Sequence, residues 1–234
     1  MNSRHFYTRL LLAALIVLVS MVSLGRAADT EEQSDLAKRL AASTQVLNEV
    51  MAAPGKSIPA GVITRAACIA VFPSTIQVAV LVGAKHGKGF ATCRTAKGWS
   101  APAPLDISGG SWGAQLGGEA VDLVLVVTDD KGVQQLESGK FNLGTETSVT
   151  AGPVGNQDMK MNSDVISYSR ARGAFAGTNI TGSSITEDED NARALYGSSI
   201  SMADILAGKV NPPRTSASFL STVQKYAGRM KQKD

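Results

Sequence analysis

The sequence predicts a single α+β domain that is rich in β-structure. Short β-prone runs, separated by glycines and prolines, fill most of residues 68–182, whereas helical patterns lie on both sides of this region. The 234 residues are 44% hydrophobic and 18% charged, which is typical of a chain that buries a substantial core. No tandem repeat or low-complexity linker divides the sequence. We therefore expect one domain with antiparallel twisted sheets, an N-terminal amphipathic helix and short C-terminal helices.

Residues 1–27 have the pattern of a secretory signal peptide. Two arginines precede a mostly apolar run at residues 10–24, and Gly25 and Ala27 supply small residues for cleavage before Ala28. The apolar run is shorter than the roughly 20 residues that a membrane-spanning helix needs, although an uncleaved anchor is the alternative. We expect export to a periplasm or the cell envelope.

The predicted signal peptide, here called the leader, also accounts for the whole net charge of the protein. The full chain has 23 basic and 20 acidic residues, and the arginines at positions 4, 9 and 26 all lie in the leader. The mature chain, residues 28–234, therefore holds 20 of each kind and has no net charge. Binding to nucleic acid by counterion release depends on an excess of basic residues, so nucleic acid is not an expected partner.

The two cysteines predict a disulfide bond. Cys68 and Cys93 each lie in a strand-like run, where they could face each other across a β-ladder. An oxidising compartment allows such a pair to form a disulfide, and two buried free thiols are the alternative. With a single histidine in the mature chain, we expect neither a metal site nor a cofactor.

Residues 30–53 predict an amphipathic helix, which ends at Pro54-Gly55. Its apolar positions recur at helical spacing and are Leu36, Leu40, Leu47, Val50 and Met51. This stripe either packs on the core, which is the more frequent role, or faces a membrane with Lys38 and Arg39 beside it. A short second helix is predicted between Pro59 and Ala67.

The central part of the sequence predicts strands. Residues 122–127 form an almost continuous β-branched run, which indicates a central strand buried on both faces. A turn is expected at 129–132 and one or two helical turns at 133–138, before a glycine-rich segment at 140–182 with short β-prone pieces. The other predicted strands are residues 69–72, 77–82 and 89–93.

The C-terminal part predicts short helices. An acidic loop at residues 186–190 leads into a helix at 191–196, and a second helix covers 201–206. Pro212-Pro213 introduces a last helix over about residues 215–230, followed by a basic tail.

One motif needs testing as a catalytic site. Residues Gly109 to Gly113 match G-x-S-x-G around Ser111, the pattern of a hydrolase nucleophile. In that fold the catalytic histidine follows the nucleophile, but both histidines of this chain, His5 and His86, precede Ser111. A serine hydrolase at Ser111 is the least favoured hypothesis, and we expect a protein that is not an enzyme.

Three glycine-rich stretches carry a resemblance to a known family. They are Gly109–Gly117 leading into the run from Asp122, Lys140–Gly144 through Ala151–Gly155, and Tyr168–Gly177 followed by Asn191 and Tyr196-Gly197. In this order they resemble the SYLF lipid-binding domain family, over about residues 36–208. The resemblance implies a single β-rich α+β domain that binds membrane lipids, notably phosphoinositides in eukaryotic members, with an amphipathic N-terminal helix implicated. Fungal relatives also bind actin.

The leading hypothesis is an exported, non-catalytic domain that binds anionic phospholipid peripherally. An apolar helix face next to basic residues suits an anionic surface, to which each basic residue contributes about 1 kcal/mol. The alternative is a periplasmic interaction or scaffold module whose glycine-rich β-surface binds an unidentified protein. The predicted lipid-binding residues are Leu36, Lys38, Arg39, Leu40 and Leu47 in the helix, Lys85, Lys88, Arg94 and Lys97 around a predicted hairpin, and Arg170 and Arg172 on one face of a strand.

Overall fold

The computed structural model describes residues 31–228, with gaps at 56, 80–81, 113–116, 146, 153–162, 172–173, 176–179 and 198–199. The predicted signal peptide at residues 1–27, Arg172 and the basic tail at 229–234 lie outside the described residues.

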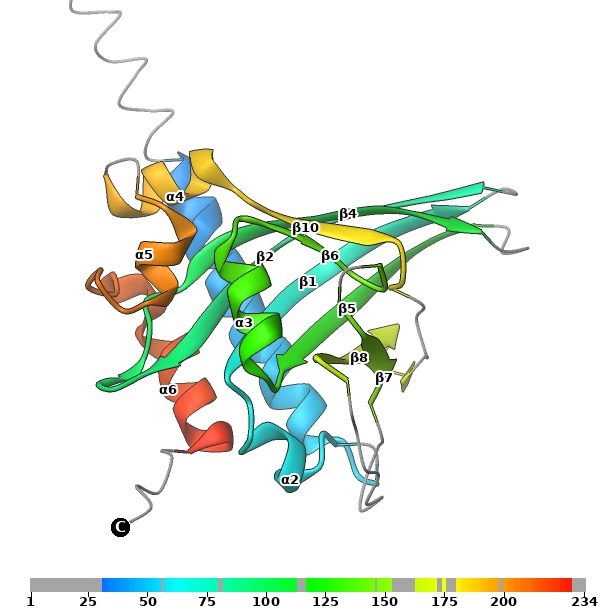
Figure 1. Ribbon diagram of the computed structural model, residues 1–234. Coiled ribbons are helices and arrows are strands. Elements are labelled where there is room, and N and C mark those ends of the chain that lie inside the picture. Colours follow the sequence, from blue (N-terminus) through cyan, green and yellow to red (C-terminus); the bar gives the residue numbers. More distant parts are fainter. Residues whose placement is uncertain are drawn as a thin grey trace, which may run out of the picture.

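A curled, mainly antiparallel sheet forms the centre of the domain (Figure 1). Its strands follow the order β6-β10-β4-β2-β1-β5-β8-β7, and β7 runs parallel to β8. Two short strands lie off this path, β3 beside β2 and β9 beside β8. The strands are β1 (Cys68–Ala79), β2 (Val82–Thr95), β3 (Gly98–Trp99), β4 (Ala103–Trp112), β5 (Gly117–Val127), β6 (Lys140–Asn142), β7 (Val149–Ala151), β8 (Val165–Ala171), β9 (Ala174–Phe175) and β10 (Ser183–Glu187).

Helices lie at both ends of the chain and between β5 and β6. The described part of the N-terminal helix covers residues 31–52. The others are α2 (Ala60–Ile63), α3 (Asp130–Glu137), α4 (Glu189–Tyr196), α5 (Met202–Leu206), the 3₁₀ turn η1 (Arg214–Ser216) and α6 (Ala217–Ala227). Asp129, Asp188 and Ser201 each accept a backbone N–H at the start of a helix, which explains where α3, α4 and α5 begin.

Both faces of the central strands are buried. One face packs against α3, α5, β6 and β10 through a cluster that includes Phe72, Leu125 and Phe141. The opposite face packs against the N-terminal helix, α2 and α6 through a cluster that includes Val124 and Phe219. Figure 1 shows α3 in front of the sheet and the N-terminal helix behind it. The predicted α+β class and the buried central strand at 122–127 are confirmed.

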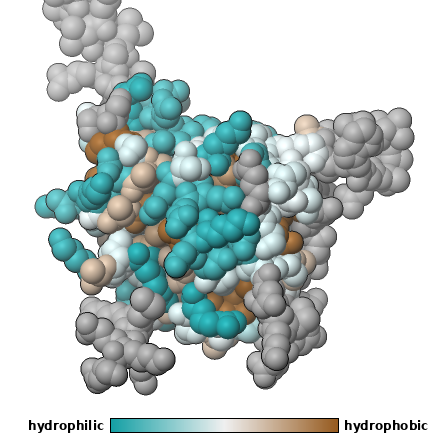
Figure 2. Space-filling model, in the orientation of Figure 1, coloured by the Kyte–Doolittle hydropathy of each residue, from teal (hydrophilic) through white to brown (hydrophobic). Residues whose placement is uncertain are grey.

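The face of the domain that carries α3 is turned toward the viewer in Figure 2. It is mostly hydrophilic, and its apolar areas are small and separate. Among the described residues, no helix combines the length and the apolarity that a membrane crossing requires.

Three sequence predictions were wrong in detail, because local patterns did not show how the chain pairs. Residues 69–72 and 77–82 were predicted as separate strands, but β1 continues past Pro73 through a β-bulge, where a proline without N–H is tolerated. The turn predicted at 129–132 is mostly the first turn of α3. The acidic loop predicted at 186–190 is the end of β10 and the start of α4.

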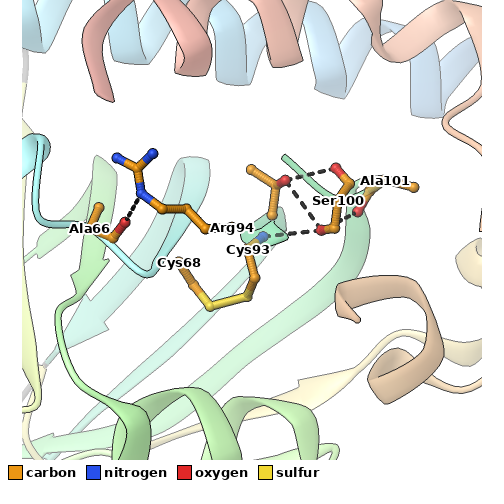
Figure 3. The surroundings of a disulfide bond; sticks show 7 residues. Ala66, Cys68, Cys93, Arg94, Ser100 and Ala101 are labelled. Atoms are coloured by element: carbon orange, nitrogen blue, oxygen red, sulfur yellow. Dashed lines mark hydrogen bonds between the residues drawn. A yellow bond between two sulfur atoms is a disulfide. The ribbon is translucent and has the colours of Figure 1, made fainter. Parts of the chain in front are cut away.

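The predicted disulfide between Cys68 and Cys93 is confirmed (Figure 3). The two residues lie directly opposite each other on β1 and β2, with their Cα atoms 4.0 Å apart. Both are buried, so the bond is shielded from solvent in the folded domain.

Replacing both cysteines by alanine is expected to lower the free energy of unfolding by about 3 kcal/mol, because the bond closes a loop of 25 residues in the unfolded chain. Urea denaturation of the wild type and the Cys68→Ala/Cys93→Ala variant measures this difference. Thiol-trapping of the unreduced wild type in urea, where both sulfur atoms are accessible, should detect no free cysteine. Two trapped thiols, or a stability difference below about 1 kcal/mol, would contradict a structural role.

Candidate functional site

The apolar stripe of the N-terminal helix is covered by the sheet. Leu36, Leu40 and Leu47 are at most 1% exposed and belong to the same core cluster as Phe90 and Val124. Full burial of a leucine side chain is worth about 1.5–3 kcal/mol relative to water, so these three residues hold the helix on the domain. In this structure, with the helix docked on the sheet, these leucines face the core, which was the more frequent role of such a stripe, and their contact with lipid stays a prediction.

The predicted basic residues of this helix stay on its outer side. Lys38 is exposed and pairs with Asp35, its Nζ atom 2.9 Å from Oδ1 of the carboxylate. Exposed pairs of this kind are worth little, so Lys38 is readily available to another anion. Arg39 is half-buried on the same helix.

Arg170 on β8 ties the N-terminal helix to the sheet. Its Nη2 atom lies 2.8 Å from Oδ2 of Asp122 on β5 and also contacts the carboxylate of Glu49 on the helix. The other oxygen of Asp122 accepts the backbone N–H of Ser74, at 3.0 Å, in the bulge of β1. A hydrogen bond from Gln45 and the contact with Arg170 hold the pKa of Glu49 below its ordinary value. We call Glu49, Asp122 and Arg170 the Arg170 cluster.

Arg94 at the end of β2 binds the ends of two helices. Its Nε atom donates to the Ala66 carbonyl after α2, at 2.6 Å (Figure 3). Its Nη1 atom donates to the Gly228 carbonyl after α6, at 2.8 Å. The Nη2 atom donates to one further carbonyl at each of these ends, and the guanidinium lies 4.6 Å from the ring centre of Trp99. A cation is favourable at the C-terminal end of a helix, where carbonyl groups are unpaired. Arg94 was predicted to bind lipid, but the structure uses its donors inside the domain.

Lys88 on β2 neutralises a buried carboxylate. Its Nζ atom lies 2.6 Å from Oδ2 of Asp188, which is 5% exposed, and 3.6 Å from Asp106. Burial alone would raise the pKa of Asp188, but hydrogen bonds from Lys88 and Asn191 outweigh it and hold that pKa below its ordinary value. Burial and the nearby Asp188 charge raise the pKa of Asp106. Lys88 is therefore a structural counter-ion.

The four basic residues of β2 and its turn do not form the single patch that the sequence predicted. Lys85 and Arg94 are nine residues apart on an extended strand, which separates them by about 30 Å. Lys85 is 4% exposed, and burial lowers its pKa to about 8. Lys97 lies exposed in the turn between β2 and β3. Of the four, Lys97 is exposed, whereas Lys88 and Arg94 are half-buried.

The remaining predicted positions add no catalytic geometry. Ser111 lies in β4, and the next described element is the strand β5 rather than the helix that a nucleophile elbow requires. Within the described residues, no group of three or more His, Cys, Asp or Glu side chains could hold a metal ion. The structure adds Glu49 and Asp122, which the sequence did not indicate, because their partners lie far away along the chain.

Comparison with known proteins finds similarity to one family. Residues 108–226 match the family described as "Ysc84: Las17-binding protein actin regulator". SH3 domain-containing YSC84-like protein 1 is 35% identical to this chain over 167 residues in both Bos taurus and Homo sapiens, covering 68% of the chain and 49% and 48% of those relatives. LAS seventeen-binding protein 3 of Saccharomyces cerevisiae is 30% identical over 192 residues, covering 78% of the chain and 41% of the relative. The chain spans about half the length of the curated relatives it matches.

The Arg94→Lys variant is expected to lose about 2 kcal/mol of stability, because an ammonium group cannot replace the planar donors that reach both helix ends. Urea denaturation measures the loss, and hydrogen exchange should show faster exchange at the end of α6. The exposed Lys97→Met is the control and should change stability by less than about 0.5 kcal/mol. Equal stability of the two variants would argue against the role of Arg94.

The Lys88→Met variant should lose about 2 kcal/mol near pH 7, less than for a fully buried pair because Lys88 is partly exposed. In the wild type the pKa of Asp188 is depressed, so its stabilising contribution is present above the ordinary aspartate pKa of about 3.9 and is lost as the pH falls through the folded-state value.

Without Lys88 the pKa of Asp188 should rise, so the stability difference from the wild type should shrink as the pH is lowered and this carboxylate is protonated. Urea denaturation between neutral and acidic pH measures this stability difference. The control is Lys140→Met, at an exposed position of β6. A difference that does not depend on pH would contradict the assignment of Lys88 as the counter-ion of Asp188.

Proposed function

The chain belongs to the Ysc84 family, the SYLF family that its sequence resembles, and we propose that it is an exported protein that binds anionic phospholipid at the membrane surface. The observation that carries the proposal is the N-terminal amphipathic helix, whose leucine stripe lies on one side, with the exposed Lys38 on the other and the half-buried Arg39 beside the stripe. A helix of this kind lies in the plane of a membrane interface and buries its apolar face among acyl chains.

Local charge supports binding to an anionic surface even though the mature chain has no net charge. Lys88, Arg94 and Arg170 are occupied by partners within the domain. Lys38 and Lys97 remain exposed. Basic residues at an anionic membrane contribute about 1 kcal/mol each, so the affinity should be modest and should decrease with salt.

The predicted signal peptide indicates the compartment in which the protein would bind lipid. If residues 1–27 are removed on export, the N-terminal helix lies close to the start of the mature chain. The protein would then act in a periplasm or the cell envelope, on the membrane that borders that space.

A protein-binding module is the second candidate function. The family description and the name of the yeast relative refer to binding of Las17, a protein partner. In this chain, the sheet face beyond the N-terminal helix exposes Ile76, at 57%, together with the small or polar side chains of Ala84, His86 and Ser108. The register places Ile76, His86 and Ser108 in one row across β1, β2 and β4. A flat exposed face of this kind suits a protein surface better than a lipid.

Co-sedimentation of residues 28–234 with vesicles tests the first proposal. We expect the protein to pellet with vesicles that contain an anionic phospholipid and to stay in solution with neutral phosphatidylcholine. Lys38→Glu/Arg39→Glu should weaken pelleting by at least tenfold, since two favourable charges of about 1 kcal/mol each are reversed.

The control for this experiment is Lys140→Glu/Lys209→Glu, which changes the net charge equally at exposed sites away from the N-terminal helix and should bind like the wild type. Absence of pelleting with every lipid, together with a stable protein partner captured from envelope extract, would favour the second candidate.

A further inference from the structure

Lipid binding by the N-terminal helix conflicts with its position in the domain. Leu36, Leu40, Leu47 and Val50 are at most 1% exposed, so none of them reaches solvent in the docked structure. Residues 31–35, in contrast, are all exposed and form the first turn of the helix that the structure describes. The apolar stripe reaches a membrane only if the rest of the helix leaves the sheet.

We propose that the Arg170 cluster is a latch that opens at an anionic membrane, where Arg170 exchanges the Glu49 carboxylate for a lipid phosphate and the N-terminal helix moves into the interface. This inference rests on the proposed lipid binding and adds to it the residue that couples docking of the helix to the lipid headgroup.

The chemistry of the exchange follows from the guanidinium group. Arginine binds carboxylates and phosphates through the same planar donors. A phosphodiester replaces Glu49 with one negative charge for one, so the charge balance around Arg170 does not change. Asp122 remains 2.8 Å from Nη2 and keeps Arg170 in place on the sheet after the helix departs. Asp122 is itself fixed by the backbone N–H of Ser74.

The side-chain ion pair and hydrogen bond that join the N-terminal helix to the rest of the domain lie near its C-terminal end. In the part of the chain that the structure describes, Glu49 contacts Arg170 and Asn48 accepts a hydrogen bond from the Tyr226 hydroxyl at 3.0 Å. Both ties lie in the last turn and a half of the helix. Release of Glu49 therefore removes one of these side-chain contacts, and the exposed residues 31–35 offer a point from which the helix can begin to leave the sheet.

The interface beneath the helix also contains buried polar atoms without a hydrogen-bond partner among the described residues. They are Oγ of Ser43 on the helix itself, the hydroxyl of Tyr168 and Nε of Arg170. Ser43 is fully buried and Tyr168 is 2% exposed, in the same cluster as the helix leucines. An unpaired buried polar atom destabilises the state in which it is buried. The docked state is thus less stable than its apolar packing alone would make it, which is the property that a releasable helix needs.

Matched neutral variants on the same helix test the latch. Glu49→Gln removes the charge that Arg170 holds, whereas Glu32→Gln removes an equal charge from the exposed first turn and does not touch Arg170. We expect hydrogen exchange over residues 36–51 to become about tenfold faster in Glu49→Gln and to stay unchanged in Glu32→Gln. Binding to anionic vesicles should strengthen more in Glu49→Gln than in Glu32→Gln.

Variants of Arg170 test the exchange for phosphate. Arg170→Gln should also accelerate hydrogen exchange in the helix, because Glu49 loses its partner. It should nevertheless bind anionic vesicles more weakly than Glu49→Gln, because the arginine that would bind the lipid phosphate is gone. Arg170→Lys should recover part of that binding. Circular dichroism and a cooperative urea transition establish that each variant is folded.

The outcomes separate failure of the latch from failure of lipid binding. If Glu49→Gln matches Glu32→Gln in exchange and in vesicle binding, the latch is wrong although the protein binds lipid. If Arg170→Gln binds vesicles as tightly as Glu49→Gln, the phosphate exchange is wrong. If Glu49→Gln loosens the helix but no variant binds any vesicle, the lipid proposal itself fails, and the inference fails with it.

Discussion

The central strands are buried on both faces, and this constraint determines the rest of the structure. Val124 and Leu125 are neighbours on β5, yet they belong to different core clusters on opposite sides of the sheet. A sheet of this kind requires a cover on each side. The N-terminal helix and α6 provide one cover, whereas α3, α5 and the strands β6 and β10 provide the other. The amphipathic stripe is therefore part of the core of the domain as well as a candidate membrane surface.

In the proposed lipid-bound state, membrane binding competes with docking of the helix. Four side chains of the stripe are buried in the docked state, and a membrane interface offers them another apolar environment. Departure of the helix would also uncover apolar side chains of the sheet, such as Val124 and Phe90, so apolar burial favours the docked state. The polar contacts of the helix exist in only one of the two states and therefore also affect the balance. Arg170 makes one of these polar contacts.

Three of the basic residues predicted to bind lipid are used inside this domain. Lys88 balances Asp188, Arg94 binds the ends of α2 and α6, and Arg170 joins the helix to two strands. These contacts join residues that are about 30 to 130 positions apart in the sequence. A charge count of 20 against 20 could not reveal this pairing, because it depends on which strands become neighbours. Lys38 and Lys97 are among the described cations that remain exposed.

The sequence by itself determined the features that depend on local periodicity. These are the N-terminal amphipathic helix, the buried strand at 122–127, the α+β class and a disulfide between two strand-like runs. It did not indicate β4, whose glycine, proline and serine residues have low strand propensity and gain their conformation from pairing with β2 and β10. Only the tertiary structure decided which side of the sheet the helix covers and which cations are occupied, because ion pairs and face burial are set by contacts between distant segments.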